Sequence, residues 1–222
     1  MVVKKGGNEE MEIKVASINV GKPQEVLFQR KSIETGIYKQ PIDGRVFVSS
    51  LNIEGDGQAD LAVHGGADKA VCLYSMDHYA YWEELLNRKL DYGAFGENLT
   101  ISGVTEEDIM IGDIYRMGEV VFQVSLPRQP CFKISVKWNE PSLPMLVQET
   151  GFSGFYFRVL QEGYIETGQP LQLVERHPSH ISVAFANTIK YKDKQNKEAL
   201  QKLIQLAPLA AEWKSSFRKR LQ

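Results

Sequence analysis

The chain lacks the features that mark secreted, membrane and disulfide-rich proteins. It has only two cysteines, Cys72 and Cys131, which are too few for a disulfide framework. No apolar run approaches the ~18 residues of a membrane-spanning helix, and residues 1–10 contain no apolar stretch typical of a signal peptide. We therefore expect a cytoplasmic protein with reduced thiols and no membrane partner.

Positive and negative charges are also nearly balanced. The formal net charge is −2 and 24% of the residues are charged, so the overall balance does not favour nucleic acid as a partner. Apolar residues make up 43% of the 222 residues, which is typical of a folded protein with one sizeable core and an appendage.

The sequence patterns of zinc, iron–sulfur and dinucleotide sites are absent. Among the four histidines, His177 and His180 lie three residues apart, but Pro178 between them prevents a shared helical face. There is no Cys-x₂-Cys or His-Glu-x₂-His spacing, which excludes a zinc enzyme. Without a four-cysteine pattern or a GxGxxG motif, any electrons used by the protein must come from outside.

Short strand-like runs separated by Gly, Pro, Asp and Asn predict a mainly-β fold between residues 13 and 174. Such a pattern favours a closed barrel or a sandwich over alternating βαβ units. Two helical patterns interrupt it, at residues 75–88 and 141–150. The predicted strands are residues 13–20, 46–53, 99–101, 113–117, 120–126, 154–160 and 164–165.

The composition changes after residue 174, where glycine disappears and helix formers dominate. Three short amphipathic helices are predicted, at residues 181–191, 197–206 and 208–221. We thus divide the chain into a loose leader (1–10), a barrel domain (11–175) and a three-helix appendage (176–222). The appendage is too small to be stable alone, so we expect it to pack on the barrel or on the partner subunit of a homodimer.

Cys131 lies in a segment with unusual chemistry, residues 125–133, SLPRQPCFK. Two prolines make the segment a stiff, extended loop. The cations Arg128 and Lys133 favour the thiolate, the form that attacks electrophiles or binds soft metals. The alternative is an inert core thiol, and that is the interpretation we favour for Cys72, which lies in the apolar run 70–74.

Three glycine-punctuated blocks accompany this loop, at residues 55–71, 93–100 and 111–118. In this order the four segments resemble the MOSC domain, the C-terminal domain of molybdenum cofactor sulfurases. The resemblance extends from residue 13 to residue 174 and is strongest to small stand-alone bacterial MOSC proteins with a short helical tail. It implies a closed MOSC-like β-barrel with few helices, followed by three helices.

The resemblance also implies a site for the molybdenum cofactor (molybdopterin). Cys131 would ligate molybdenum or carry sulfur, while Lys39, Lys69 and Arg128 would neutralise the phosphate of the pterin. Each of these cations has an alternative role as a surface charge. Asp56 and Asp60 would repel a phosphate, so we expect them to orient cations or cap turns.

Two further residues are assigned to the cofactor pocket. Asn98 offers an amide that suits the hydrogen-bonding edge of a pterin, and His64 precedes Gly65-Gly66, where the backbone can approach a ligand closely. For both residues a local turn role remains an alternative.

Three functions remain open at this point. The chain resembles reductases of small N-hydroxylated compounds, which take electrons from a separate flavin or iron–sulfur protein. The second hypothesis is a persulfide carrier that uses the same Cys131 without metal. Related sulfurases carry a pyridoxal-phosphate desulfurase domain that has no counterpart here, so this chain would accept sulfur from a cysteine desulfurase rather than generate it. The third hypothesis is a non-catalytic binding module.

Overall fold

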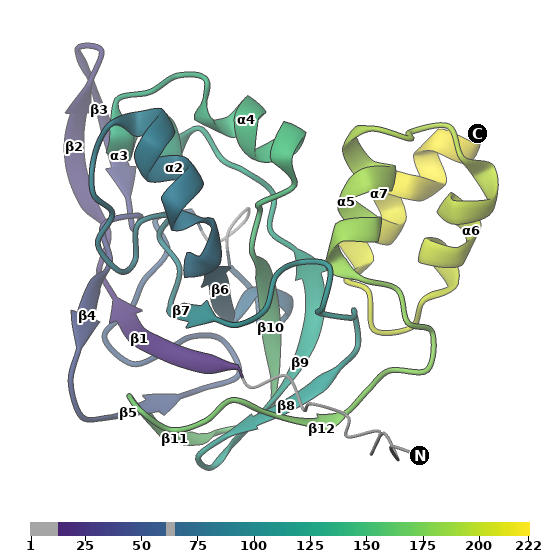
Figure 1. Ribbon diagram of the computed structural model, residues 1–222, viewed down its shortest axis with the longest axis horizontal. Helices are drawn as coiled ribbons and strands as arrows, with labels where there is room; N and C mark the ends of the chain where they lie inside the picture. Colours follow the sequence, from purple (N-terminus) through teal and green to yellow (C-terminus); the bar gives the residue numbers. More distant parts are fainter. Residues whose placement is uncertain (1–12, 61–64) are drawn as a thin grey trace, which may run out of the picture.

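The computed structural model describes residues 13–60 and 65–222, and an eight-stranded sheet is their main feature (Figure 1). Its strand order is β12-β8-β9-β10-β6-β7-β1-β4, with antiparallel neighbours except for the parallel pair β6 and β7. The strands are β1 (Lys14–Val20), β4 (Gln40–Ile42), β6 (Val71–Ser75), β7 (Leu99–Ser102), β8 (Ile114–Met117), β9 (Val120–Pro127), β10 (Phe155–Gln161) and β12 (Gln172–Glu175).

The sheet curls into a half-barrel and does not close. Among the described residues, its edge strands β4 and β12 do not pair with each other. An isolated bridge joins Ile13, beside β1, to Leu171, beside β12. The mainly-β prediction is confirmed, but the closed barrel is wrong. One physical reason lies in β4, where Pro41 has no N–H to donate to a further strand and so favours an edge position. A separate two-stranded sheet of β5 (Arg45–Val48) and β11 (Gly163–Glu166) lies near this opening (Figure 1).

Several elements were not predicted. The hairpin of β2 (Gln24–Phe28) and β3 (Lys31–Thr35) turns at Gln29 and Arg30, which both have positive φ, although Asn and Gly are the usual signals for such turns. The helix α3 (Lys133–Trp138) has six residues, too few to produce a recognisable helical period. It begins two residues after Cys131.

The other helices follow the predicted patterns. The first pattern forms a short 3₁₀ helix, η2 (Met76–His78), followed by α2 (Tyr79–Leu86), and the second forms α4 (Leu143–Thr150). The C-terminal segment forms α5 (Val183–Tyr191), α6 (Lys197–Gln205) and α7 (Ala211–Leu221). Within the described ranges, no helix is both long and apolar enough to cross a membrane.

The three C-terminal helices share one hydrophobic core with the sheet. Val183, Leu200 and Trp213 are fully buried in the same cluster as Phe122 and Phe157 of the sheet. The backbone N–H of Ala210 also donates to the carbonyl of Ser125 on β9, at 3.0 Å. The helices therefore pack on the half-barrel of their own chain, one of the two arrangements that we expected.

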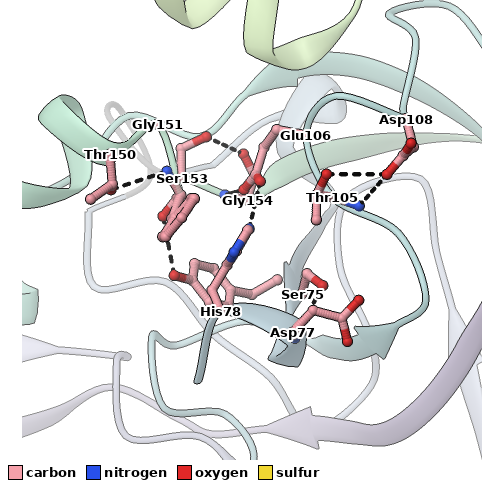
Figure 2. Close-up of polar contacts among 12 residues, drawn as sticks. Ser75, Asp77, His78, Thr105, Glu106, Asp108, Thr150, Gly151, Ser153 and Gly154 are labelled. Carbon is pink, nitrogen blue, oxygen red and sulfur yellow. Dashed lines mark hydrogen bonds and ion pairs between the residues drawn. The ribbon is translucent and has the colours of Figure 1, made fainter. Parts of the chain in front are cut away.

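A buried polar cluster joins the sheet to these helices (Figure 2). His78 Nε2 lies 2.7 Å from Glu106 Oε2, and the other oxygen of this carboxylate accepts the N–H of Gly154 at 2.7 Å. The carbonyl of Glu106 accepts the N–H of Ala184, in the first turn of α5. The His78 ring also stacks on Phe152, with 3.8 Å between ring centroids. Glu106 thus connects three segments that lie far apart in the sequence.

We predict that Glu106→Ala lowers the free energy of unfolding by about 3 kcal/mol, because it leaves a histidine nitrogen and a backbone N–H buried without partners. Chemical denaturation at neutral pH measures this change. The matched control is Glu107→Ala, which removes the same group from an exposed neighbour and should change the stability by no more than about 0.5 kcal/mol. Equal effects of the two substitutions would show that the Glu106 cluster contributes nothing specific.

Candidate functional site

Most of the predicted site residues line one small cavity of about 80 Å³. It brings together Lys39, Lys69, Asn98, Arg128 and Cys131 from four separate segments of the chain, the last two from the same loop. His64 lies outside the described residues. The described residues that line it are Thr35, Gly36, Ile37, Lys39, Gly57, Gln58, Ala59, Lys69, Cys72, Gly96, Asn98, Arg128, Cys131, Lys133 and Tyr156.

Cys131 is held on a short connection between a strand and a helix. Strand β9 ends at Pro127, and the N–H of Arg128 then donates to the carbonyl of Gly154 at 3.0 Å. On the other side, the carbonyl of Cys131 accepts the N–H of Ile134 in the first turn of α3, at 3.1 Å. The predicted stiff loop is therefore present, but its first residues belong to the strand.

The two thiols in the cavity wall differ in accessibility. Cys131 is partly exposed, whereas Cys72 is buried within β6. Burial raises the pKa of the Cys72 thiol to about 11, because the interior disfavours a thiolate. The structure agrees with an inert role for Cys72 and leaves Cys131 as the thiol open to a reagent or metal.

Close contacts between loops at the cavity require glycine at two positions. Gly96 has φ +79°, and a Cβ there would lie 2.8 Å from Cγ1 of Ile37. A Cβ at Gly36 would lie 2.4 Å from the carbonyl oxygen of Gly57. Larger residues would push apart the loops that form the cavity wall.

The side chain of Asn98 already makes hydrogen bonds with the protein. Its Nδ2 donates to Asp56 Oδ2 at 2.9 Å and to the carbonyl of Asn19 at 3.3 Å. Its Oδ1 accepts the N–H of Cys72 at 3.0 Å. A contact between this amide and a pterin remains a prediction, and it would have to share or replace one of these bonds.

Asp56 orients a cation, as we expected from its charge. Its Oδ1 accepts a hydrogen bond from Lys39 Nζ and another from the N–H of Gly21 at 2.9 Å. The carboxylate is fully buried, and burial without a cationic partner would be costly. Lys39 is thus fixed at the cavity by a buried carboxylate that is not among the described lining residues.

Glu97 is a structural residue that the sequence analysis missed. This fully buried carboxylate accepts hydrogen bonds from the N–H groups of Gly93 and Phe95, at 3.0 and 2.9 Å. It also accepts from the hydroxyls of Tyr79 and Thr100, at 2.8 and 2.9 Å. Glu97 therefore shapes the loop that carries Gly96. A single carboxylate inside the second glycine-rich block was the available signal.

The electrostatics of the cavity favour an anion. Lys39, Lys69, Arg128 and Lys133 line it, and none of the described lining residues is acidic. The Arg128 guanidinium donates to the carbonyl of Phe95, a bond that positions the cation without neutralising its charge. Lys69 Nζ lies 2.8 Å from Glu212 Oε2 on helix α7.

Two family models match the chain with this arrangement of half-barrel, cysteine loop and helices. A model described as MOSC domain matches residues 60–172, and a model described as YiiM-like, 3-alpha helix domain matches residues 181–222. The chain belongs to the MOSC family. The predicted resemblance to stand-alone bacterial MOSC proteins with three C-terminal helices is confirmed.

Similar proteins support the same assignment. The uncharacterized protein YflK of Bacillus subtilis is 50% identical to this MOSC chain over 93% of both sequences. The crystal structure of YiiM from Geobacillus stearothermophilus superimposes with a TM-score of 0.81, at 42% identity, and covers 95% of this chain and all of that one. A protein named Reductase from Gibberella moniliformis is 41% identical over 65% of this chain, a match that spans 26% of its own length.

We predict that iodoacetamide modifies Cys131 at least tenfold faster than Cys72 in the native protein at pH 8. With a pKa of about 11, only about one Cys72 thiol in a thousand is ionised at that pH. Peptide mass spectrometry over a time course measures both rates. Cys131→Ser should remove the fast reaction and Cys72→Ser should leave it. A fast reaction that persists in Cys131→Ser would contradict the assignment of the accessible thiol.

Proposed function

We propose that this MOSC protein is a cytoplasmic enzyme that binds the molybdenum cofactor and reduces small N-hydroxylated compounds. The observation that carries this proposal is a partly exposed thiol, Cys131, at a cavity lined by four cations and, among the described residues, by no carboxylate. Membership of the MOSC family and the partial similarity to a protein named Reductase support it.

The residues present fit the cofactor in chemistry. A thiolate is the protein ligand that soft, sulfur-bound metals prefer, and lysine and arginine neutralise phosphate. The enclosed volume of about 80 Å³ is small beside the ~300–1,000 Å³ of typical cofactor pockets. The cavity therefore suits a phosphate group, while a whole pterin needs space beyond it.

Each protein group has a distinct task in this proposal. Cys131 would provide the metal ligand, and its place between β9 and α3 fixes its direction. Arg128 and Lys69 would hold the phosphate, and Lys39 would contribute positive charge from its fixed pair with Asp56. The bound cofactor supplies the redox chemistry, while the protein supplies anchoring and orientation.

The overall reaction consumes two electrons and two protons for each N–O bond that breaks. The hydroxylamine nitrogen takes up one of these protons to become an amine, and the hydroxyl group takes up the other and leaves as water. The electrons would come from a separate flavin or iron–sulfur protein, because the sequence contains neither a four-cysteine pattern nor a dinucleotide motif.

We predict that protein purified from a host that makes the cofactor contains molybdenum and reduces an N-hydroxylated base or amidoxime with reduced viologen. It should be inactive with NADH alone. Cys131→Ser should lose molybdenum and at least 100-fold of the activity, because an alcohol is a poor ligand for a soft metal. Metal analysis and an amine-product assay measure these effects.

Cys72→Ser is the matched control, since it makes the same change at the buried thiol of the cavity and should keep both metal and activity. Folding of each variant is checked by circular dichroism. A molybdenum-replete protein that reduces no N-hydroxylated compound would contradict the reductase. Uptake of labelled sulfur on Cys131 from a cysteine desulfurase, without molybdenum, would instead favour the persulfide carrier.

A further inference from the structure

The three-helix extension places a carboxylate on one of the cavity cations. Lys69 ends the short 3₁₀ helix η1 (Ala67–Lys69), and its ammonium lies 2.8 Å from Glu212 in the first turn of α7. The Lys69 side chain is 12% exposed, whereas that of Glu212 is 44% exposed. This ion pair therefore connects the wall of the cavity to a carboxylate that also faces solvent.

The other carboxylate–lysine pair at the cavity is built differently. Asp56, the partner of Lys39, is fully buried and also accepts hydrogen bonds from Gly21 and Asn98. Separating Asp56 from Lys39 would leave a buried charge without its counter-ion, at a high cost. One lysine of the cavity thus has a fixed counter-ion, and the other has one that can exchange.

Glu212 can leave Lys69 at a small cost. Lys69 is its only polar partner among the described residues. The pair is exposed on the Glu212 side, where water can replace the lysine, and an anion that enters the cavity would take the place of the carboxylate at the largely buried Lys69. In the first turn of α7, the released carboxylate would still benefit from the N-terminal end of the helix.

Lys69 itself is anchored through its neighbour. Asp68 forms an ion pair with Arg158 on β10, at 2.7 Å. The carbonyl of Asp68 accepts the hydroxyl of Ser125 on β9, at 2.6 Å. Because η1 is attached to both central strands, a change at this pair moves the Glu212 side chain rather than the backbone of Lys69.

We propose that Glu212 is an internal competitor for the anion site and that a phosphate group entering the cavity displaces it from Lys69. A phosphate carries about −1.5 to −2 charges at pH 7 and thus outcompetes a single carboxylate. Glu212 then sets the affinity of the site for phosphate monoesters and makes it selective against singly charged anions. The inference rests on the proposed function only in naming the pterin phosphate as the natural occupant.

The test is an isothermal titration calorimetry experiment in which inorganic phosphate is added to the full chain at constant ionic strength. Glu212→Gln keeps the shape of the side chain and removes the competing charge, so phosphate should bind about fivefold more tightly than to the wild type. Lys69→Gln should weaken binding in both the wild-type and the Glu212→Gln backgrounds.

Glu198→Gln is the matched control. Glu198 forms a similar 2.8 Å ion pair with Lys202 on α6, in an exposed position that does not line the cavity. This variant has the same net charge as Glu212→Gln, so any general electrostatic gain appears in both. Only the excess affinity of Glu212→Gln over Glu198→Gln supports the competitor role.

Weaker or unchanged binding in Glu212→Gln, relative to the control, would overturn the inference, as would an absence of phosphate binding in all variants. Neither result depends on molybdenum. A chain that shows the excess affinity but, when loaded with molybdenum, reduces no N-hydroxylated compound would keep the competitor role and reject the reductase. An active, metal-loaded chain without it would do the reverse.

Discussion

The hydrogen bonds of Asn98 are the constraint on which the rest of the cavity depends. Through its backbone, Asn98 accepts from Asn19 on β1 and donates to Cys72 on β6, at 2.6 and 2.8 Å. Through its side chain it reaches the N–H of Cys72 and the carboxylate of Asp56. One residue therefore sets the spacing of two strands and the position of the counter-ion of Lys39. If Asn98 moved, the parallel pairing of β6 and β7 would be disturbed, and Asp56 would no longer be held beside Lys39.

Burial accounts for the different chemistry of otherwise similar groups around this cavity. The carboxylates Asp56 and Glu97 are buried and each accepts several hydrogen bonds, so they act as permanent parts of the wall. Glu212 is half-exposed with a single partner, so it can exchange. The same distinction separates the two thiols, because Cys72 lies inside a strand and Cys131 lies at an accessible connection. Position relative to solvent, rather than residue type, decides which groups can react.

The parts of the structure that sequence patterns predicted are those with local signals. Alternating apolar runs identified most strands, and the helical periods of the C-terminal segment identified α5, α6 and α7. The glycine-rich blocks and the cysteine loop predicted residues that do meet at one cavity. What the sequence could not predict depends on contacts between distant segments. The pairs His78–Glu106 and Lys69–Glu212 join residues 28 and 143 positions apart, and neither leaves a local pattern. The failure of the sheet to close likewise depends on how its two edges meet.

Ser125 connects the helical extension directly to the segments that form the cavity. Its carbonyl accepts the N–H of Ala210, immediately before α7, and its hydroxyl donates to the carbonyl of Asp68 in η1. The loop that follows this strand carries Arg128 and Cys131. Ser125, near the end of β9, thus holds both the residue before α7 and the helix η1 that carries Lys69, and the cysteine loop follows it closely in the sequence. Because Ser125 is fully buried, none of these bonds can be exchanged for water without leaving an unpaired group in the core. The ion pair between Lys69 and Glu212 therefore joins two segments that Ser125 already holds in place.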